Sequence, residues 1–246
     1  KVDMARLLLS RGRDELLCLY TFKTGDYYTA DYYRHQIDML WNHAMRRTIF
    51  VFPVDVVAHA HWSTTAPVAR TETAKLARLL EDKGIARDGV AWMDQARREI
   101  LAELDRRGTA TTRELGRSLP ELVATIEVGG GRFSAHSRMV LLMGFEGSVV
   151  RNRPLGTWIS SQYVWSTMAA TFPGVIDPDR PLDPEESATR LTERYLEAFG
   201  PVTTRDLAWW TGWGITRARR ALAAAGAVEV GLDAGAGWVH PDDDLP

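Results

Sequence analysis

Arginine side chains in two stretches of the chain have the type and spacing that suit contact with an anion. They are Arg217, Arg219 and Arg220 in a predicted helix, and Arg151 and Arg153 in a predicted hairpin. A guanidinium fork can hydrogen-bond a phosphate or the edge of a guanine base. Both stretches are therefore candidates for contact with nucleic acid. An ordinary solvated face without a bound partner is the alternative.

Two histidines, His59 and His61, would suit a metal if an extended strand placed them on one face. Zinc sites need three or four protein ligands, and no third ligand lies nearby in the sequence. A role on the surface or in the core is the interpretation that we favour. The glycine run 129–131 lacks the strand–loop–helix context and the lysine of a phosphate loop. We therefore expect no metal and no cofactor.

The elements that must position the arginines contain an internal repeat. The stretch "GTATTREL", which starts at Gly108, recurs as "GPVTTRDL", which starts at Gly200, and each follows a segment with apolar residues four positions apart. Glycine is typical of the position just past a helix. Thr111 and Thr203 can each cap a new helix, and an acidic residue three positions later makes a capping box, in a weaker aspartate variant in the second copy. The repeat predicts two helix–turn–helix starts.

Each copy continues with a third helix and a hairpin. After the second copy, a helix over 215–226 is followed by a strand over 227–232 and a return strand. After the first copy, a long insertion precedes a helix over 137–147 and a hairpin over 148–163. The helix over 137–147 is mainly apolar, so we expect it to pack in the core or between domains rather than to read a DNA groove. The hairpin arginines are then the better candidates in that copy.

The N-terminal third of the chain is predicted to hold a related unit. Thr29 can cap a helix over 30–44, whose apolar residues recur at helical spacing, and a buried strand follows over 46–53. Near the other end, the tryptophans of "WWTGW" (209–213) are predicted to fill the core of the last unit and its seam with the unit before it.

The composition is that of a soluble globular protein. The chain has 246 residues, of which 45% are hydrophobic and 25% charged. Its single cysteine, Cys18, excludes an intrachain disulfide and fits a reducing compartment. The apolar runs are too short to cross a bilayer, so we expect a cytoplasmic protein with no membrane contact. The net charge of −2 does not itself indicate nucleic acid, but acidic residues concentrate in 177–186 and 242–244, which permits local basic clusters elsewhere.

Together these patterns predict a mainly α fold with short β-hairpins, of the α+β class, built from tandem winged helix-turn-helix domains. A first winged-helix-like unit covers 1–70, and a second winged helix with preceding helices covers 71–172. A linker rich in proline and aspartate covers 173–186, and a third winged helix covers 187–241. An acidic tail covers 242–246. We expect the protein to be a monomer.

Three stretches of the chain resemble the AlkZ/AlkX (YcaQ)-like family of winged-helix DNA glycosylases. They are "MRRTIFVFP" (45–53), "RPLGTWISSQYVW" (153–165) and "DLAWWTGWGITRARRALAAAGAVEVGLDAGAGWV" (206–239). The resemblance implies tandem winged helices on a concave DNA-binding surface, followed by a C-terminal β-rich domain that would begin where this chain ends. It implies double-stranded DNA as the partner, carrying alkylated or crosslinked bases in the branches that excise them. Arg46 and Arg47 in the first stretch are then further candidates for DNA contact.

Excision by such an enzyme needs a specific set of polar groups. Cleavage of an N-glycosidic bond builds positive charge on the sugar, so a carboxylate or an amide must stabilise it or orient water. The resemblance assigns this work to a Gln-x-Gln or Gln-x-Asp motif well upstream of the Arg-Thr strand, but the corresponding region, Arg6–Tyr20, contains no glutamine. The only Gln-x-Asp lies directly before that strand, at Gln36 and Asp38. These two are the catalytic candidates, and two solvated residues on a helix face are the alternative.

The sequence leaves three functions open. A glycosylase follows from the resemblance and from the basic third helix. A non-enzymatic DNA-binding protein, such as a regulator or a resistance protein that shields lesions, follows from the missing glutamine motif. Winged helices also serve in protein contacts, and the near-neutral charge is compatible with that role.

Overall fold

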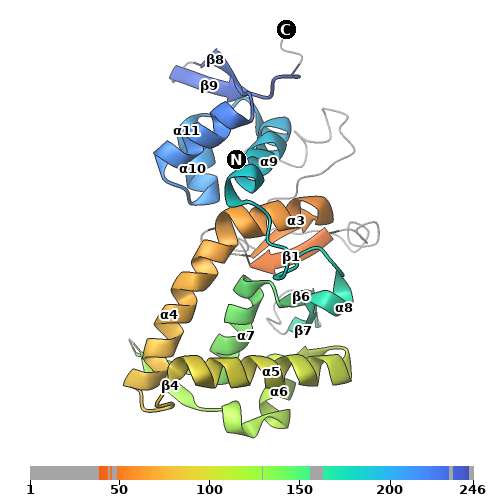
Figure 1. Ribbon diagram of the computed structural model, residues 1–246, viewed down its shortest axis with the longest axis vertical. Helices are drawn as coiled ribbons and strands as arrows, with labels where there is room; N and C mark the ends of the chain where they lie inside the picture. The colour runs from red at the N-terminus through yellow and green to blue at the C-terminus, as the bar shows by residue number, and fades with distance from the viewer. Residues whose placement is uncertain are drawn as a thin grey trace. The chain divides into compact units, whose positions relative to one another are not determined.

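The computed structural model describes residues 39–43, 45, 49–128, 130–155, 163–232 and 235–243. Most of these residues lie in helices, and the strands form small sheets, so the predicted mainly α composition with short hairpins is confirmed (Figure 1). The chain divides into two compact units. The terminal unit comprises Lys1–Leu40, Ala44–Thr64 and Pro181–Pro246, and the central unit comprises Trp41–His43 and Thr65–Arg180.

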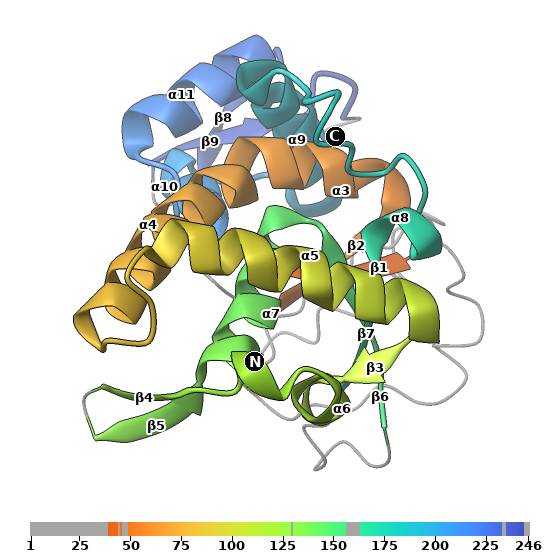
Figure 2. The same ribbon diagram turned by 60° about the horizontal axis from the view of Figure 1, so that its bottom comes forward.

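The central unit begins with two long helices and closes with a three-stranded sheet. Its elements are α4 (Ala66–Asp82), α5 (Gly89–Arg107), β3 (Ala110–Thr111), α6 (Thr112–Ser118), the 3-10 turn η3 (Pro120–Leu122), β4 (Thr125–Val128), β5 (Gly131–Ser134), α7 (Ala135–Glu146), β6 (Val149–Pro154), β7 (Tyr163–Thr167) and α8 (Met168–Thr171). The sheet is antiparallel, with the order β3–β7–β6. Strands β4 and β5 form a separate hairpin that projects beyond α6 and α7 (Figure 2).

Helix α5 buries one face in the core of the central unit, as its apolar spacing predicts. The side chains on this face are at most 1% exposed: Met93, Ala96, Ile100 and Leu104. They belong to one apolar cluster with Met139 and Met143 of α7. The helix ends at Gly108, whose φ of 76° favours glycine.

A bidentate ion pair fixes α5 to the end of α7. Arg97 donates from Nε and Nη2 to the two carboxylate oxygens of Glu146, at 2.9 and 2.8 Å. The hydrogen bond with Glu146 raises the pKa of Arg97. Both groups are half-buried, and the two hydrogen bonds between them are charge-assisted. The contact therefore orients α7 relative to α5 as well as adding stability.

The terminal unit combines a strand–helix segment from early in the chain with a helical segment from its end. Its elements are β2 (Ile49–Pro53), α3 (Val54–Ala60), the π-helical turn η2 (His61–Thr65), α9 (Pro184–Phe199), α10 (Thr204–Thr211), α11 (Ile215–Ala224), β8 (Val228–Leu232) and β9 (Gly235–Val239). Helices α3 and α9 pack together, and β8 and β9 pair antiparallel.

Aromatic side chains from three elements form the core of the terminal unit. Phe50 and Phe52 of β2 are 1% and 0% exposed, which confirms the predicted buried strand. Trp210 of α10 stacks on Tyr195 of α9, with ring centroids 4.6 Å apart, and meets Phe50 edge-on at 6.2 Å. These contacts join segments that are far apart in the sequence.

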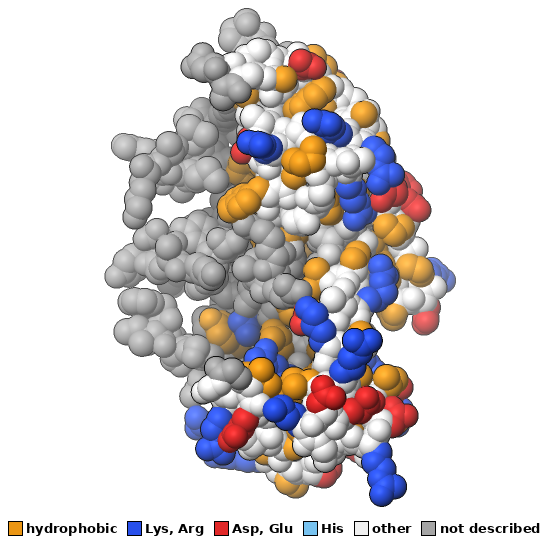
Figure 3. Space-filling view, turned by 90° about the vertical axis from the view of Figure 1, so that its left-hand side faces the viewer, with side chains coloured by type: hydrophobic (Ala, Val, Ile, Leu, Met, Phe, Trp, Pro, Cys, Tyr) orange, Lys and Arg blue, Asp and Glu red, His pale blue; other side chains and the backbone are white. Residues whose placement is uncertain are grey.

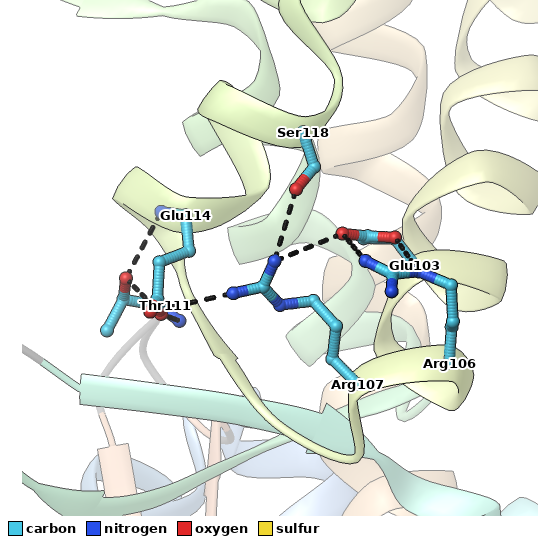
Figure 4. A network of polar contacts seen from close by, with 6 residues as sticks. All are labelled: Glu103, Arg106, Arg107, Thr111, Glu114 and Ser118. Carbon is cyan, nitrogen blue, oxygen red and sulfur yellow. Dashed lines mark hydrogen bonds and ion pairs between the residues drawn. The ribbon is translucent and has the colours of Figure 1, made fainter.

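In the first copy of the repeat, the two adjacent threonines have different partners. Thr111 accepts a hydrogen bond from the Glu114 backbone N–H at 3.2 Å, and the Glu114 carboxylate accepts from the Thr111 N–H at 2.7 Å (Figure 4). This is the predicted capping box of α6. Thr112 instead accepts from the indole N–H of Trp165 at 3.1 Å. Trp165 lies on β7 opposite Ala110, the residue just before the threonine pair.

The second copy repeats this arrangement contact for contact. Thr203 and Asp206 form the reciprocal capping box of α10, so the predicted aspartate variant is confirmed. Thr204 accepts from the indole N–H of Trp238 at 3.1 Å. Val202, just before the pair, exchanges two backbone hydrogen bonds with Trp238, at 2.9 and 2.8 Å. In both copies, therefore, the first threonine caps a helix and the second joins that helix to a tryptophan on a returning strand.

Surface ion pairs hold the turn between α5 and α6. Arg107 reaches Glu103 and Ser118, at 3.4 and 3.3 Å, and lies 3.7 Å from Glu114 (Figure 4). Arg106 donates two hydrogen bonds of 2.8 Å to Glu103, and these lower the pKa of that carboxyl to about 2. Exposed pairs of this kind each contribute little, so they support the turn rather than determine it.

Two predictions about local structure are corrected. The helix predicted over 30–44 is wrong for Met39–His43, which form strand β1 beside β2 in a two-stranded sheet. A buried strand such as β2 needs a partner for its backbone groups, and this requirement overrides the helical spacing. The prediction that the tryptophans of 209–213 fill the core is wrong for Trp209, which is 69% exposed. Helix α10 has only one buried face, and Trp210 occupies it.

We expect Thr203→Ala to lower the free energy of unfolding by about 1 kcal/mol, because the variant removes the cap of α10. Thr204→Val should cost a similar amount, roughly 1 kcal/mol, because the Trp238 indole N–H then lacks its acceptor. Urea denaturation followed by tryptophan fluorescence measures both changes. Thr71→Ala is the matched control, since its hydroxyl only bonds the Pro67 carbonyl within the exposed face of α4. Equal losses in all three variants would contradict the assignment.

Candidate nucleic-acid interface

Helix α11 presents a basic surface because only one of its faces is buried. Ala218, Ala221 and Leu222 are at most 5% exposed and pack inward. Arg219 and Arg220 are exposed on the opposite side of the helix. Within the part of the chain that the structure describes, neither arginine has a hydrogen-bond or ion-pair partner. Ile215 is 40% exposed at the start of the helix.

Arg217 belongs to the same helix but is held by the protein itself. Its guanidinium donates to the backbone carbonyl of Ser63 at 3.0 Å and to that of Pro184 at 3.2 Å. It also pairs with Glu185 at 3.0 Å and lies over the ring of Trp213, 5.0 Å from the centroid. Arg217 thus tethers α11 to η2 and to the start of α9. Of the three arginines predicted on this helix, the structure leaves Arg219 and Arg220 on the open surface.

Helix α10 adds a basic and an aromatic side chain that the sequence analysis missed. Arg205 is exposed in the first turn, and Trp209 follows four positions later, one helical turn away on the same side. Both belong to the repeat or directly follow it, so the signal was present in the sequence. The apolar character of "WWTGW" led to the prediction that Trp209 is buried, so its exposed position beside Arg205 was not anticipated.

The third helix of the first copy is different, as predicted. Eight of the twelve residues of α7 are buried, and the single arginine in it, Arg138, lies over the Phe133 ring, 4.0 Å from its centroid. A helix so enclosed offers little surface to a nucleic acid. The prediction that this helix packs in the core is confirmed.

The two hairpin arginines predicted in the first copy lie on β6. Arg151 has its guanidinium carbon 4.1 Å from the centroid of Tyr163 and 5.1 Å from that of Trp165, both on β7. Burial lowers the pKa of Arg151 below its usual value. Arg153 lies in the same strand, and its side chain is outside the described residues.

Four further candidates lie outside the described residues altogether. They are the catalytic candidates Gln36 and Asp38, and the DNA-contact candidates Arg46 and Arg47. They stay predictions from the sequence.

A pocket of about 260 Å³ lies within the central unit, between α4, α7 and the β4–β5 hairpin. Its walls are mainly apolar, and the Lys75–Glu72 ion pair lies at one side. None of the arginines or histidines predicted from the sequence as site residues lines this pocket.

The two histidines considered for a metal lie on helical backbone rather than on a strand. His59 is in α3 and His61 is in η2, and no group of three or more potential metal ligands occurs among the described residues. His61 is 2% exposed, its ring packs edge-on against Trp62, and burial lowers its pKa to about 4. It is therefore a neutral core residue at pH 7.

The surface in Figure 3 carries Lys and Arg side chains among apolar and uncharged ones, with acidic side chains between them. No helix in the described ranges has the length and apolar character needed to cross a membrane. The two capped repeats and the exposed arginines of α11 define the class of protein. It is a mainly helical protein that repeats a helix–helix–hairpin arrangement and exposes arginines on the third helix of one repeat.

The model of a family described as DNA glycosylase AlkZ-like matches residues 20–246. The chain therefore belongs to the AlkZ-like DNA glycosylase family. The structure is similar to that of the Streptomyces sahachiroi DNA glycosylase AlkZ, with a TM-score of 0.56 and 17% sequence identity. The similarity covers 86% of this chain and 55% of that protein's chain. No curated protein matches the sequence.

Burial of His61 predicts a pH dependence of stability. The unfolded chain takes up a proton near pH 6.5, but the folded protein resists it until about pH 4. The free energy of unfolding should therefore fall by about 3 kcal/mol as the pH drops through this window, and not above it. In His61→Phe this part of the slope should vanish, as measured by urea denaturation from pH 7 to 4. His240→Gln is the control, and an unchanged slope in His61→Phe would refute the prediction.

Proposed function

We propose that this protein acts on double-stranded DNA as a glycosylase that hydrolyses the N-glycosidic bond of alkylated or crosslinked bases. The observation that carries the proposal is the family match over residues 20–246. The similarity to the Streptomyces AlkZ fold and the exposed arginines of α11 support it. We further propose that the protein works as a monomer in the cytoplasm.

We infer that two winged helices carry the DNA contacts. One would comprise α5, β3, α6, α7 and the β6–β7 hairpin, and the other α9, α10, α11 and the β8–β9 hairpin. The support for this inference is the element order together with the pairing of each repeat to a strand of its own hairpin. The β1–β2 segment would belong to a third, N-terminal unit of the same kind, covering about the first 70 residues as predicted from the sequence.

Arg219 and Arg220 are proposed to contact the phosphate backbone or guanine edges. The geometry of Arg217 supports this division of roles, because its tether holds α11 while its two neighbours face solvent. An exposed guanidinium without an acidic partner binds a phosphate without first breaking an internal ion pair.

Gln36 and Asp38 are proposed as the catalytic pair, with Arg46 and Arg47 as nearby DNA contacts. The Asp38 carboxylate would stabilise the positive charge that develops on the sugar or take the proton of the attacking water, and the Gln36 amide would orient that water. The products would be a free base and an abasic site. This chemistry needs no metal and no cofactor.

We expect the double variant Arg219→Ala/Arg220→Ala to bind duplex DNA more weakly than the unmodified protein. The slope of the logarithm of the binding constant against the logarithm of the salt concentration is negative. Its magnitude should decrease by about 2, one for each phosphate that the variant no longer neutralises. Fluorescence anisotropy over a series of salt concentrations measures it. The matched control, Arg106→Ala/Arg132→Ala, removes the same charge from surface ion pairs with Glu103 and Glu127. Equal slopes for the two double variants would argue against α11 as the interface.

We expect the protein to release the alkylated base from a duplex with one N7-methylguanine, leaving an abasic site that hot alkali cleaves. Gln36→Ala and Asp38→Asn should each slow excision by about 10²-fold or more without weakening binding. Gln95→Ala and Asp82→Asn, which change the same residue types on α5 and α4, are the controls. Binding without excision by the unmodified protein would favour the non-enzymatic alternative, a regulator or lesion-shielding protein.

A further inference from the structure

Arg151 is held in a position that a cation without a partner does not normally occupy. It lies on β6 opposite Trp165 of β7, and Tyr163 is two residues before Trp165, on the same face of that strand. The two rings therefore meet one guanidinium, at 4.1 and 5.1 Å from its central carbon. These two aromatic contacts cover part of the guanidinium and shield that part from water.

The charge of Arg151 has no acidic counterpart among the described residues. Three of the other four half-buried arginines, Arg97, Arg194 and Arg217, each pair with a carboxylate, at 2.8 to 3.1 Å. The fourth, Arg138, lies over the Phe133 ring. Arg151 makes no such pair, and its Nε–H is buried without an acceptor. Burial lowers the pKa of Arg151, and the nearby Tyr163 offsets only part of this effect.

The terminal amino groups of Arg151 differ from its Nε. They also have no hydrogen-bond partner in the described chain, yet they are not among the buried unpaired atoms, so they retain contact with solvent. The guanidinium thus has a closed inner edge and an accessible outer edge. An anion that reaches the outer edge would find two parallel N–H donors already oriented.

We propose that Arg151 is a receptor for a single phosphate of the DNA backbone, with Tyr163 and Trp165 holding its guanidinium flat for bidentate contact. This inference rests on the proposed function and adds a contact in the central unit, on a strand rather than on a third helix. A phosphate fits better than a base edge, because it carries a full negative charge and the partly desolvated cation has no anionic partner within the described chain. The unpaired charge is a cost in the free protein that the bound phosphate removes.

The inference makes stability and binding respond in opposite directions. In Arg151→Met, an apolar chain of similar length stays packed against the rings, so the thermal midpoint of the free protein should stay the same or rise. The salt slope for an undamaged duplex should fall by about 1, and affinity should fall equally for different sequences. Arg151→Lys keeps the charge and should keep the slope, with weaker binding because one ammonium replaces the fork.

Arg138→Met is the matched control, because Arg138 is also half-buried against a ring, Phe133 of the neighbouring hairpin. It should leave the salt slope unchanged. A slope in Arg151→Met equal to that of the unmodified protein, or a lower thermal midpoint with no change in slope, would overturn the inference and identify Arg151 as a packing residue. The proposed function would survive that result, since Arg219 and Arg220 would still account for binding.

A second measurement separates the two failures. Inorganic phosphate, compared with sodium chloride at equal ionic strength, should raise the thermal midpoint of the unmodified protein more than that of Arg151→Met. If the protein binds no duplex at any salt concentration, the proposed function fails. The difference in the phosphate-induced shift of the thermal midpoint between the unmodified protein and Arg151→Met then tests by itself whether Arg151 binds a phosphate. Equal shifts in the two proteins would then overturn it.

Discussion

The arrangement of both repeats depends on a pair of adjacent threonines that share no partner. The first caps the next helix through its hydroxyl, and the second accepts the indole N–H of a tryptophan on a strand far along the chain, at 3.1 Å in each copy. A residue just before the pair bonds the backbone of that same tryptophan or lies opposite it. Three consecutive residues thus cap a helix and attach its start to a strand of the hairpin that follows later in the chain. Neither threonine can perform the other's role, which explains why the doublet recurs.

The two repeats share this arrangement of threonines and tryptophan, but they present different surfaces because their third helices differ in burial. In the central unit, α7 is enclosed by α4 and α5, and the Arg97–Glu146 pair holds its end. In the terminal unit, α11 buries only small residues and a leucine, so its other face stays open. Arg217 acts on α11 as Arg97 acts on α5, by tying the helix to its neighbours through a guanidinium. A basic helix needs such an anchor if its remaining arginines are to be presented in a fixed direction.

The distribution of paired and unpaired cations separates structural arginines from candidate functional ones. Carboxylates pair with Arg97, Arg194 and Arg217, which are half-buried and connect elements. Arg219 and Arg220 lie in water, where an unpaired charge costs little. Arg151 alone combines a lowered pKa through burial with an unpaired Nε among the described arginines. Proteins tolerate such a cost where binding compensates for it.

The sequence by itself determined the features that depend on neighbours within one turn. The helical segment before each copy of the repeat, both capping boxes, the buried strand at Phe50 and Phe52, and the enclosed third helix of the first copy all follow from local spacing and cap chemistry. The resemblance of the quoted stretches also indicated the family. Only the tertiary structure decided which arginines are free, because the partners of Arg217 lie at Ser63 and Pro184, far along the chain. It likewise decided that Met39–His43 form a strand, that Trp209 is exposed and that Arg151 lies against two rings. Each of these is set by a contact between distant segments, and local residue patterns carry no information about such contacts.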